Sequence, residues 1–249
     1  MAAGAPLTPE ADEAGHTLRV AMAAACRRLH ARGLLAGAEG NISCRLPDGG
    51  LLITASGVDK GAVTYRDILQ LSADGTIHHD ERTGDTPGNA APRDSVRRPS
   101  SELGMHLACY AARADVQAVV HAHPPVATGF AAAGRGIPAD VLPELPVVVG
   151  PVALVPYGRP GTPALAAALH PYLEHHEVFL LANHGVTAVG HSLEDALLRM
   201  ESVEQAARIL AVAGLLGGAT PLPASEAAAL AALHPRRRGA PVPSATGVS

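Results

Sequence analysis

Hydrophobic and polar positions divide the chain into segments of helical and of strand periodicity. Apolar residues recur at helical spacing over residues 8–32, which predicts a helix that stops at Gly33. Apolar runs at 37–46 and 51–54 flank a Pro-Asp-Gly-Gly turn, which is typical of a hairpin. Short apolar runs predict further strands at 68–71, 76–78, 115–123, 147–149, 153–155, 177–182 and 186–189. Helical spacing predicts further helices at 64–67, 100–113, 124–133, 162–174, 192–210 and 225–233.

Hydroxyl side chains precede three of these helices and are candidate amino-terminal caps. They are Ser100 or Ser101 for the helix at 100–113, Thr162 for the next long helix, and Ser192 for the longest one. Such caps accept a hydrogen bond from a free backbone N–H of the first turn, so we expect each helix to begin there.

Two segments lack this periodicity. Residues 80–98 are polar and rich in Pro, Gly, Asp and Arg, which favours a mobile surface loop over a boundary between domains. The Pro- and Arg-rich residues 235–249 predict a disordered tail. No internal repeat is visible, and a length of 249 residues suits one large core. We therefore expect a single domain over residues 1–234.

Composition and charge narrow the classes of partner. Two Phe, four Tyr and no Trp leave few rings that could stack on nucleic-acid bases, and the net charge is -4. The one concentrated positive run stands at 236–238, in the predicted tail. Nucleic acid and anionic membrane surfaces are therefore not favoured as partners.

Cysteine usage and the amino terminus indicate a compartment. Cys26, Cys44 and Cys109 are odd in number and lie in apolar patterns, which predicts buried thiols in a reducing compartment. The first residues show no secretion signal, and no apolar run approaches the ~18 residues of a membrane span. We therefore expect a cytoplasmic protein.

A candidate metal site begins with two histidines of the strand at 115–123. Alternate residues of a strand point to the same face about 6 to 7 Å apart, so His121 and His123 can converge on one ion. His184 is a third candidate ligand in a tight turn, where Gly185 lets another backbone or a substrate come close. Taken alone, His-x-His also occurs by chance, and a lone turn histidine is more often structural.

Glu102 stands at the start of the predicted helix that leads directly into the His-x-His strand. Its carboxylate could reach the same ion, although the helix dipole alone also favours an acid at this position. Three imidazoles and a carboxylate that can leave would form a site with an exchangeable fourth position.

Polar residues nearby suggest a cradle for an anion. A side-chain amide, hydroxyl groups and loop amides at a helix start are groups that bind phosphate. The candidates are Asn41, Ser56, Gly57, Ser100 and Ser101, and each also has an ordinary explanation as a cap or turn residue.

Lys60 is the single lysine of the chain. It lies in a loop beside Gly61, where the sequence shows no apolar pocket that would lower its pKa. Schiff-base chemistry is therefore not favoured, and carbonyl chemistry would more plausibly use a metal.

Five motifs occur in a fixed order along the chain. They are Gly40-Asn-Ile-Ser-x-Arg45, Thr54-Ala-Ser-Gly57, Pro99-Ser-Ser-Glu102 followed by Met105-His106, Val120-His-Ala-His-Pro124, and Leu181-Ala-Asn-His-Gly185. In this order they resemble the class II aldolase/adducin family, and most of all its fuculose-phosphate aldolase branch. The resemblance spans about residues 8–215 and is specific as a set, although each piece is weak alone.

The resemblance implies an α/β fold with three layers, α/β/α, around a largely antiparallel central sheet. It implies a homotetramer with the active site at a subunit interface. Carried over by position, it implies that His121, His123 and His184 bind a divalent metal, most often Zn²⁺, with Mn²⁺, Co²⁺ or Fe²⁺ as other candidates. Glu102 would be a ligand that leaves as the substrate arrives and then acts as acid and base. The residues implied to hold a substrate phosphate are Asn41, Ser56, Gly57, Ser100 and Ser101.

The activity implied is that of a metal-dependent lyase. A class II aldolase would cleave a phosphorylated ketose, such as a fuculose phosphate, to dihydroxyacetone phosphate and an aldehyde through a metal-stabilised enediolate. The same metal site would also serve a decarboxylase of a keto or aromatic acid, a sugar-phosphate 4-epimerase or a dehydratase. A non-catalytic, adducin-like assembly protein is disfavoured because the three histidines and the glutamate are all present.

One departure from the aldolase branch bears on the substrate. Leu142 stands where that branch has a tyrosine that serves as general acid from a neighbouring subunit. Asp140, Glu144 or Tyr157 could replace it, or the reaction needs no such acid. A decarboxylase tolerates the loss more easily than an aldolase or an epimerase.

Overall fold

The computed structural model describes residues 9–73, 75–78 and 97–234. The predicted tail at 235–249 and most of the predicted loop at 80–98 lie outside the described residues. The predictions for these two segments therefore stay predictions.

Eight strands within the described residues form one sheet, in the order β4-β3-β2-β1-β5-β8-β7-β6. Their bounds are β1 Asn41–Arg45, β2 Leu51–Thr54, β3 Ile68–Leu71, β4 Ile77–His78, β5 Ala118–Ala122, β6 Val152–Val155, β7 Val178–Leu181 and β8 Gly185–Gly190. Every neighbouring pair is antiparallel except β6 with β7. The largely antiparallel sheet is thus confirmed, as is the hairpin, which is formed by β1 and β2.

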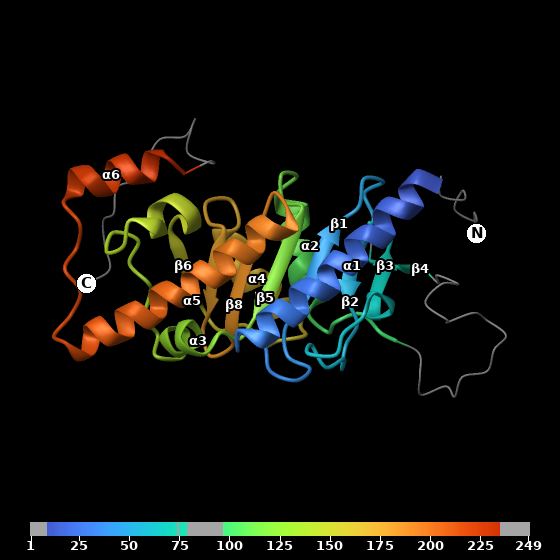
Figure 1. Cartoon of the computed structure of the whole chain (residues 1–249), viewed down its shortest axis with the longest axis horizontal. Helices are drawn as coiled ribbons and strands as arrows, with labels where there is room; N and C mark the ends of the chain where they lie inside the picture. Colours follow the sequence, from blue (N-terminus) through green and yellow to red (C-terminus); the bar gives the residue numbers. More distant parts are fainter. Residues whose placement is uncertain (1–8, 74, 79–96, 235–249) are drawn as a thin grey trace.

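Helices cover both faces of this sheet. Their bounds are α1 Pro9–Ala31, α2 Leu103–Ala112, α3 Pro125–Ala132, α4 Pro163–Leu169, α5 Leu193–Leu215 and α6 Ala224–Ala232. The first core cluster joins α1, α3 and α5 to one face of the sheet, and the second joins α2 and α4 to the other. Figure 1 shows α1 and α5 crossing in front of the strands. The three-layer α/β/α fold is therefore confirmed.

The alternation of side chains along β5 assigns the histidine to a face. Ala118 and Val120 belong to the core under α1 and α5, whereas Val119 belongs to the core under α2 and α4. Since successive residues of a strand point to opposite faces, His121 lies on the α2 side together with Val119. On the neighbouring strand Asn41 pairs with His121, so the two residues share this face.

The predicted strand at 147–149 is wrong. Residues Leu145–Val149 form a single π-helical turn that ends at Gly150, whose φ is 73°. Leu145 and Val149 are both buried in the core under α5. A short apolar run meets the burial needs of a strand and of a helical turn equally well, so periodicity could not separate them.

The capping predictions were right for two helices and wrong for one. The Thr162 hydroxyl accepts from Ala164 N, and the Ser192 hydroxyl accepts from Asp195 N. The helix α2 begins at Leu103 with Glu102 in the cap position, and no side-chain cap bond is formed there. The serines before it are instead drawn into the candidate site described below.

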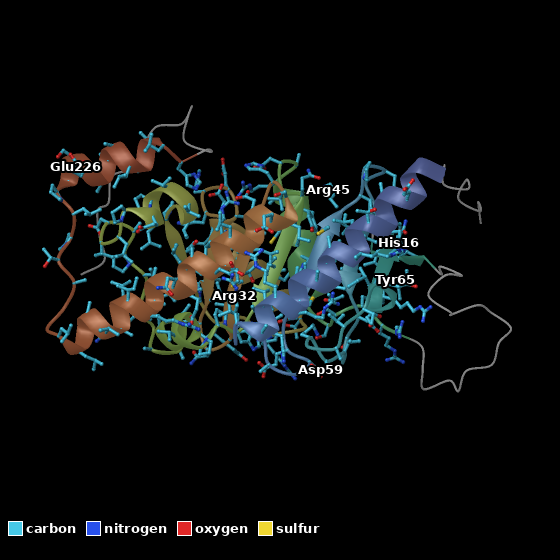
Figure 2. The ribbon with its side chains drawn as sticks, viewed as in Figure 1. His16, Arg32, Arg45, Asp59, Tyr65 and Glu226 are labelled. Atoms are coloured by element: carbon cyan, nitrogen blue, oxygen red, sulfur yellow. The ribbon has the colours of Figure 1, made fainter. Side chains whose placement is uncertain are left out.

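The predicted short helix at 64–67 forms one 3-10 turn, Tyr65–Asp67. The Asp67 carboxylate accepts from both the backbone N–H and the hydroxyl of Thr64, each at 2.8 Å. The ring of His16 on α1 meets the ring of Tyr65 edge-on, with centroids 4.9 Å apart (Figure 2). This contact joins the first helix to the outer half of the sheet.

The expectation that the cysteines are buried thiols is confirmed. Cys26, Cys44 and Cys109 are free and buried, and burial raises the pKa of Cys26 to about 12. A thiol with such a pKa stays protonated and behaves as a small apolar side chain. Over the described part of the chain, no helix has the length and apolar character needed to cross a membrane.

Candidate metal centre

The His-x-His pair lies where β5 ends. His121 is on the strand with its side chain fully buried, between Asn41 of β1 and Thr187 of β8. His123 follows the end of the strand and is partly exposed. The two Nε2 atoms lie 3.2 Å apart, so the two imidazoles converge as the spacing predicted.

The other ring nitrogen of each histidine faces an oxygen that can only accept a hydrogen bond. His121 Nδ1 donates to the Val186 carbonyl oxygen at 3.0 Å, and His123 Nδ1 donates to the Glu39 carboxylate at 3.2 Å. These bonds assign the proton of each neutral ring to Nδ1 and leave the Nε2 lone pair available. Fixing the tautomer through the outer nitrogen is typical of metal-binding histidines.

His184 completes the cluster from the turn between β7 and β8. Asn183 has a φ of 56°, and His184 N donates to the Leu181 carbonyl, which closes a tight turn. A Cβ on Gly185 would lie 2.5 Å from the His123 ring and 2.7 Å from the Ala122 carbonyl, so the close approach of the strands requires glycine here. One ligand atom from each of the three histidines lies within 4.8 Å of the other two.

The Glu102 carboxylate lies against the same cluster. One oxygen is 3.2 Å from His121 Nε2, and the other is 3.0 Å from His184 Nε2. Burial raises the pKa of Glu102, but the bond to His184, the electrostatic effect of His121 and the Asn41 amide lower it more. The net pKa lies well below its ordinary value. The carboxylate is therefore ionised and aimed at the point where the imidazoles meet.

Two of the candidate phosphate residues are bonded to Glu102, Asn41 to its carboxylate and Ser100 to its backbone N–H. Asn41 Nδ2 donates to Glu102 at 2.9 Å and to the Ser100 hydroxyl at 2.8 Å. The backbone N–H of Glu102 is 3.3 Å from the Ser100 oxygen, so the serine lies under the start of α2. The structure thus brings Asn41, Ser100 and Glu102 into one buried cluster.

The other three candidates lie around this cluster on loops. Ser56 N donates to the Arg98 carbonyl at 2.8 Å, and Ala55 forms a bridge with Pro99, which holds the loop with Ser56 and Gly57 beside the segment leading to Ser100. Ser101 is exposed, and Gly161 of the loop after β6 lies against it. These contacts do not test whether Ser56, Gly57 and Ser101 bind phosphate, so that role stays a prediction.

The expectation for Lys60 is corrected by the structure. Its side chain is 1 % exposed, and burial lowers the pKa of its ammonium group. Nζ donates to the carbonyls of Ala38 and Val58 at 3.0 and 2.9 Å, which ties together the loops that carry Glu39 and Gly57. Asp59, labelled in Figure 2, marks this position below the end of α1. Only the folded loops create the pocket, so its absence from the sequence was misleading.

Two further residues of the site were missed in the sequence. Glu39 stands two positions before Asn41 and binds His123, although an isolated acid in a glycine-rich loop gives no signal of this. His106 belongs to one of the five motifs but is not among the predicted site residues, yet it is fully buried and bonded to Asn41. Its position four residues after Glu102, on the same face of a helix, was the signal available.

The donor set fits a divalent metal. Neutral rings with their protons on Nδ1 place two Nε2 lone pairs 3.2 Å apart beside a carboxylate, an arrangement that needs a cation or a proton between them. Three imidazole nitrogens with a carboxylate are typical zinc ligands, and the carboxylate could yield its position to a substrate. The triad His121, His123 and His184 could therefore hold a metal ion.

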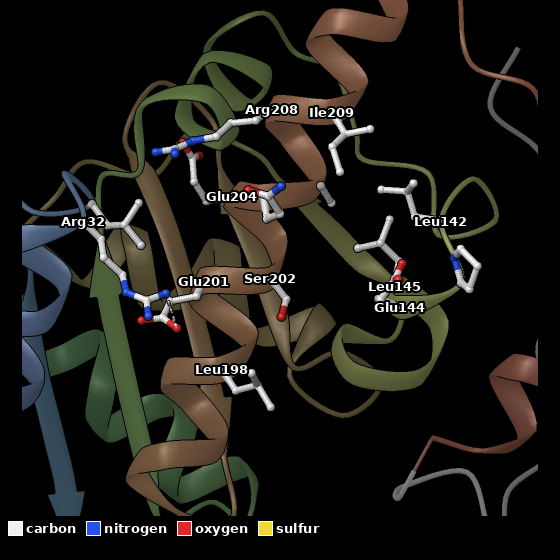
Figure 3. A pocket seen from close by; sticks show the side chains of 14 residues that line it. Arg32, Leu142, Glu144, Leu145, Leu198, Glu201, Ser202, Glu204, Arg208 and Ile209 are labelled. Carbon is white, nitrogen blue, oxygen red and sulfur yellow. Dashed lines mark hydrogen bonds and ion pairs between the residues drawn. The ribbon is translucent and has the colours of Figure 1, made fainter.

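A cavity of about 900 Å³ lies elsewhere, along the middle of α5 (Figure 3). Leu142 and Glu144 line it, so two positions from the segment that lacks the expected tyrosine face this cavity. Tyr157 instead follows β6, whose end at Val155 accepts from the backbone N–H of Ala182, close to the His184 turn. Of the three replacement acids, Tyr157 is the one that follows β6, the strand paired with β7, which leads into the His184 turn.

The fold and the site define a class of protein in which a three-layer α/β/α scaffold presents an imidazole cluster and a buried carboxylate. The profile described as "Class II Aldolase and Adducin N-terminal domain" matches residues 20–211. The chain belongs to the class II aldolase and adducin family.

Individual relatives carry two kinds of activity in their names. A 3-oxo-tetronate 4-phosphate decarboxylase of Escherichia coli is 34% identical over 203 residues, which are 80% of this chain and 88% of that protein. An L-fuculose phosphate aldolase of Methanococcus maripaludis is 31% identical over 74% of this chain and 91% of its own length. The crystal structure of YgbL from Escherichia coli, described as an aldolase, epimerase or decarboxylase, superposes with a TM-score of 0.77 at 30% identity, over 88% of this chain and 99% of that one.

Proposed function

We propose that this protein is a metal-dependent lyase that breaks a carbon–carbon bond next to a carbonyl group in a phosphorylated, sugar-derived substrate. The observation that carries the proposal is the convergence of three imidazoles, two of which contact the Glu102 carboxylate. A bound divalent ion, Zn²⁺ by its donor set, would polarise the carbonyl and stabilise the negative charge that develops on its oxygen.

The side chains around the cluster divide the remaining work. His121, His123 and His184 hold the ion, and the Asn41 amide with the Ser100 hydroxyl supplies donors for the substrate phosphate. Ser56, Gly57 and Ser101 complete this phosphate cradle from the surrounding loops. Glu102 moves the proton, because it is the buried carboxylate nearest to the imidazole nitrogens.

Decarboxylation of a phosphorylated 3-oxo acid is the form of this reaction that we favour. Carbon dioxide leaves without giving up or taking a proton, the bonding electrons pass to the carbonyl oxygen, and Glu102 delivers a proton taken from water to the carbon. Aldol cleavage must also remove a proton from a hydroxyl of the departing aldehyde, which needs a further group at the site. Leu142 in place of the tyrosine and the decarboxylase from Escherichia coli both support the simpler reaction.

The test is to incubate the zinc-loaded protein with 3-oxo-tetronate 4-phosphate and with L-fuculose 1-phosphate. We expect the first compound to release carbon dioxide and dihydroxyacetone phosphate in equal amounts. An aldehyde and dihydroxyacetone phosphate from the second compound, with no carbon dioxide from the first, would establish the aldolase instead.

An aldolase remains the second candidate, because of one observation. Tyr157 is 59 % exposed two residues after β6, whose last residue Val155 accepts from Ala182 N, and its hydroxyl could serve as the missing acid. Tyr157→Phe distinguishes the two reactions, since we expect it to leave decarboxylation unchanged. Loss of an aldol activity in this variant would support the aldolase.

Glu102→Gln tests the proton-transfer role in either reaction. The three histidines remain, so we expect zinc content near that of the wild type. General acid–base catalysis is worth about 10²- to 10⁴-fold, and we expect kcat to fall by this factor. Wild-type turnover in Glu102→Gln would remove Glu102 from the mechanism.

We also propose that the chain assembles as a homotetramer. Large apolar side chains on the outer side of α5 are exposed, and they continue past its end; they are Leu198, Ile209, Val212, Leu215 and Leu216. Such a stripe next to a cavity is typical of a surface that is covered in an assembly. Light scattering of the purified protein tests this, and a mass of one chain at micromolar concentration would refute it.

A further inference from the structure

A chain of side-chain hydrogen bonds runs through the layer between α2 and the sheet and ends at Glu102. The Tyr110 hydroxyl lies 2.8 Å from the Ser43 oxygen, which lies 2.6 Å from His106 Nδ1. His106 Nε2 is bonded to Asn41 Oδ1, and Asn41 Nδ2 lies 2.9 Å from the Glu102 carboxylate. None of the three outer residues, Tyr110, Ser43 and His106, was part of the predicted site.

The carboxylate sets the direction of every bond in this chain. The Asn41 amide nitrogen donates to a Glu102 oxygen and to the Ser100 oxygen, so its carbonyl oxygen faces His106. His106 must then donate from Nε2. A neutral ring has one donor, so its Nδ1 accepts from the Ser43 hydroxyl. The Ser43 oxygen in turn accepts from the hydroxyl of Tyr110.

Burial keeps this arrangement from exchanging with water. Ser43 and His106 are fully buried, and Asn41 is 3 % exposed. Burial lowers the pKa of His106 to about 4, against the opposing effect of the nearby Glu102 charge, so the ring is neutral at pH 7. In such surroundings an amide turned the wrong way would leave two buried groups unpaired, which is costly.

We propose that His106 is a positioning residue whose Nε2–H holds the Asn41 amide with its N–H group toward Glu102 and Ser100. Asn41 bonds both the carboxylate and the serine through this one nitrogen. If the amide were reversed, its carbonyl oxygen would face the carboxylate and would repel both Glu102 and a substrate phosphate. The catalytic consequence rests on the proposed function, whereas the direction of the bonds does not.

The tautomer of His106 is the direct test, and it needs neither metal nor substrate. Long-range ¹H–¹⁵N spectra of the metal-free, ¹⁵N-histidine-labelled protein at pH 7 separate the two tautomers and the charged ring. The signal is assigned among the 13 histidines by its absence in His106→Gln. We expect the proton on Nε2. A proton on Nδ1, or on both nitrogens, would overturn the proposal.

A matched pair of variants tests the consequence for the reaction. The amide nitrogen of Gln reaches about as far as Nε2 of histidine, whereas the shorter Asn reaches only as far as Nδ1. We therefore expect His106→Gln to keep kcat within a few-fold, and His106→Asn to lose about 10- to 100-fold, the scale of outer-shell partners, at unchanged zinc content. Equal kcat in the two variants would contradict the positioning role.

Controls separate this inference from a general effect on folding and from the proposed function. Tyr110→Phe removes the first donor of the hydrogen-bond chain but leaves the Glu102 carboxylate. We therefore expect the His106 proton to stay on Nε2. Movement of this proton to Nδ1 would contradict a bond direction imposed by Glu102. A melting temperature is measured for each variant. If the wild type turns over none of the substrates, the proposed function fails, and the tautomer measurement still decides this inference.

Discussion

Two regions on opposite faces of the sheet differ in what they offer a ligand. The cavity along α5 has a volume of about 900 Å³, yet four of the five charged side chains that line it form ion pairs with one another. Arg32 contacts Glu201 at 3.0 Å and Arg208 contacts Glu204 at 2.8 Å, as Figure 3 shows. In the imidazole cluster on the α2 side, Nε2 lone pairs and a carboxylate are forced together. Unrelieved charge, more than hollow volume, marks the chemical site.

The difference extends to how the two regions are stabilised. Glu204 also accepts from the backbone N–H groups of Val126 and Ala127 at the start of α3, so it serves the fold. In the other region His184 Nδ1 is buried and has no hydrogen-bond partner among the described residues. The cluster therefore contains a buried ring nitrogen that the fold leaves unsatisfied, unlike the paired carboxylate of Glu204.

The largest effect is expected from removing a ligand. In His184→Ala, two imidazoles remain, and zinc affinity should fall by more than the ~100-fold that outer-shell partners cost. Metal analysis after dialysis should find little bound zinc, and activity should be lost. The matched control in the cavity lining is Gln205→Ala, which should keep both the bound zinc and the activity of the wild type. Full zinc content in His184→Ala would exclude this histidine as a ligand.

Acid should destabilise the metal-free site through His106. The pKa of this fully buried ring is lowered to about 4 from an ordinary 6.5, so between these values the unfolded chain takes up a proton that the folded chain does not. Stability is therefore full above pH 6.5 and falls as the pH drops toward 4, by about 3 kcal/mol. Urea titrations across this range measure the loss. The free energy of unfolding of His106→Gln should fall by less over the same pH range. An equal fall in the wild type and in this variant would contradict the assignment to His106.

A smaller effect is expected from Glu39→Ala. The carboxylate accepts from His123 Nδ1, and its loss frees the ring to change tautomer or orientation. We expect zinc affinity to fall by about 10- to 100-fold, with the fold intact. Competition with a zinc-binding dye measures this affinity. No change would show that the His123 ring is held by other contacts.

The smallest effect on the metal is expected from the cavity side. Leu198→Asp places a charge on the exposed apolar stripe of α5, and we expect it to lower the mass of the assembly. Zinc content per chain should equal that of the wild type, because the sheet separates the two regions. Loss of zinc together with loss of mass would show that the metal centre depends on assembly.

The local sequence pattern predicted most of the helices and strands. It also predicted the three histidines and Glu102 that the structure brings together, but not Glu39 or His106. Helices and strands were found because burial on one face imposes a period, as in α1, β5 and α5. The histidines of β5 were found because strand geometry alone brings alternate residues together. The run at 147–149 was misassigned because three apolar residues are too few to distinguish the period of a strand from that of a helix.

The sequence by itself indicated which residues could hold a metal, since the nature and spacing of His121, His123 and Glu102 are local properties. Only the tertiary structure decided what surrounds them. Glu39 and His106 act through residues that are distant in sequence, 84 positions away for Glu39 and His123, and no periodicity records such a contact. Lys60 is likewise buried by contacts that only the folded loops provide. Strand order and loop closure bring these partners together, and those depend on packing over the whole sheet.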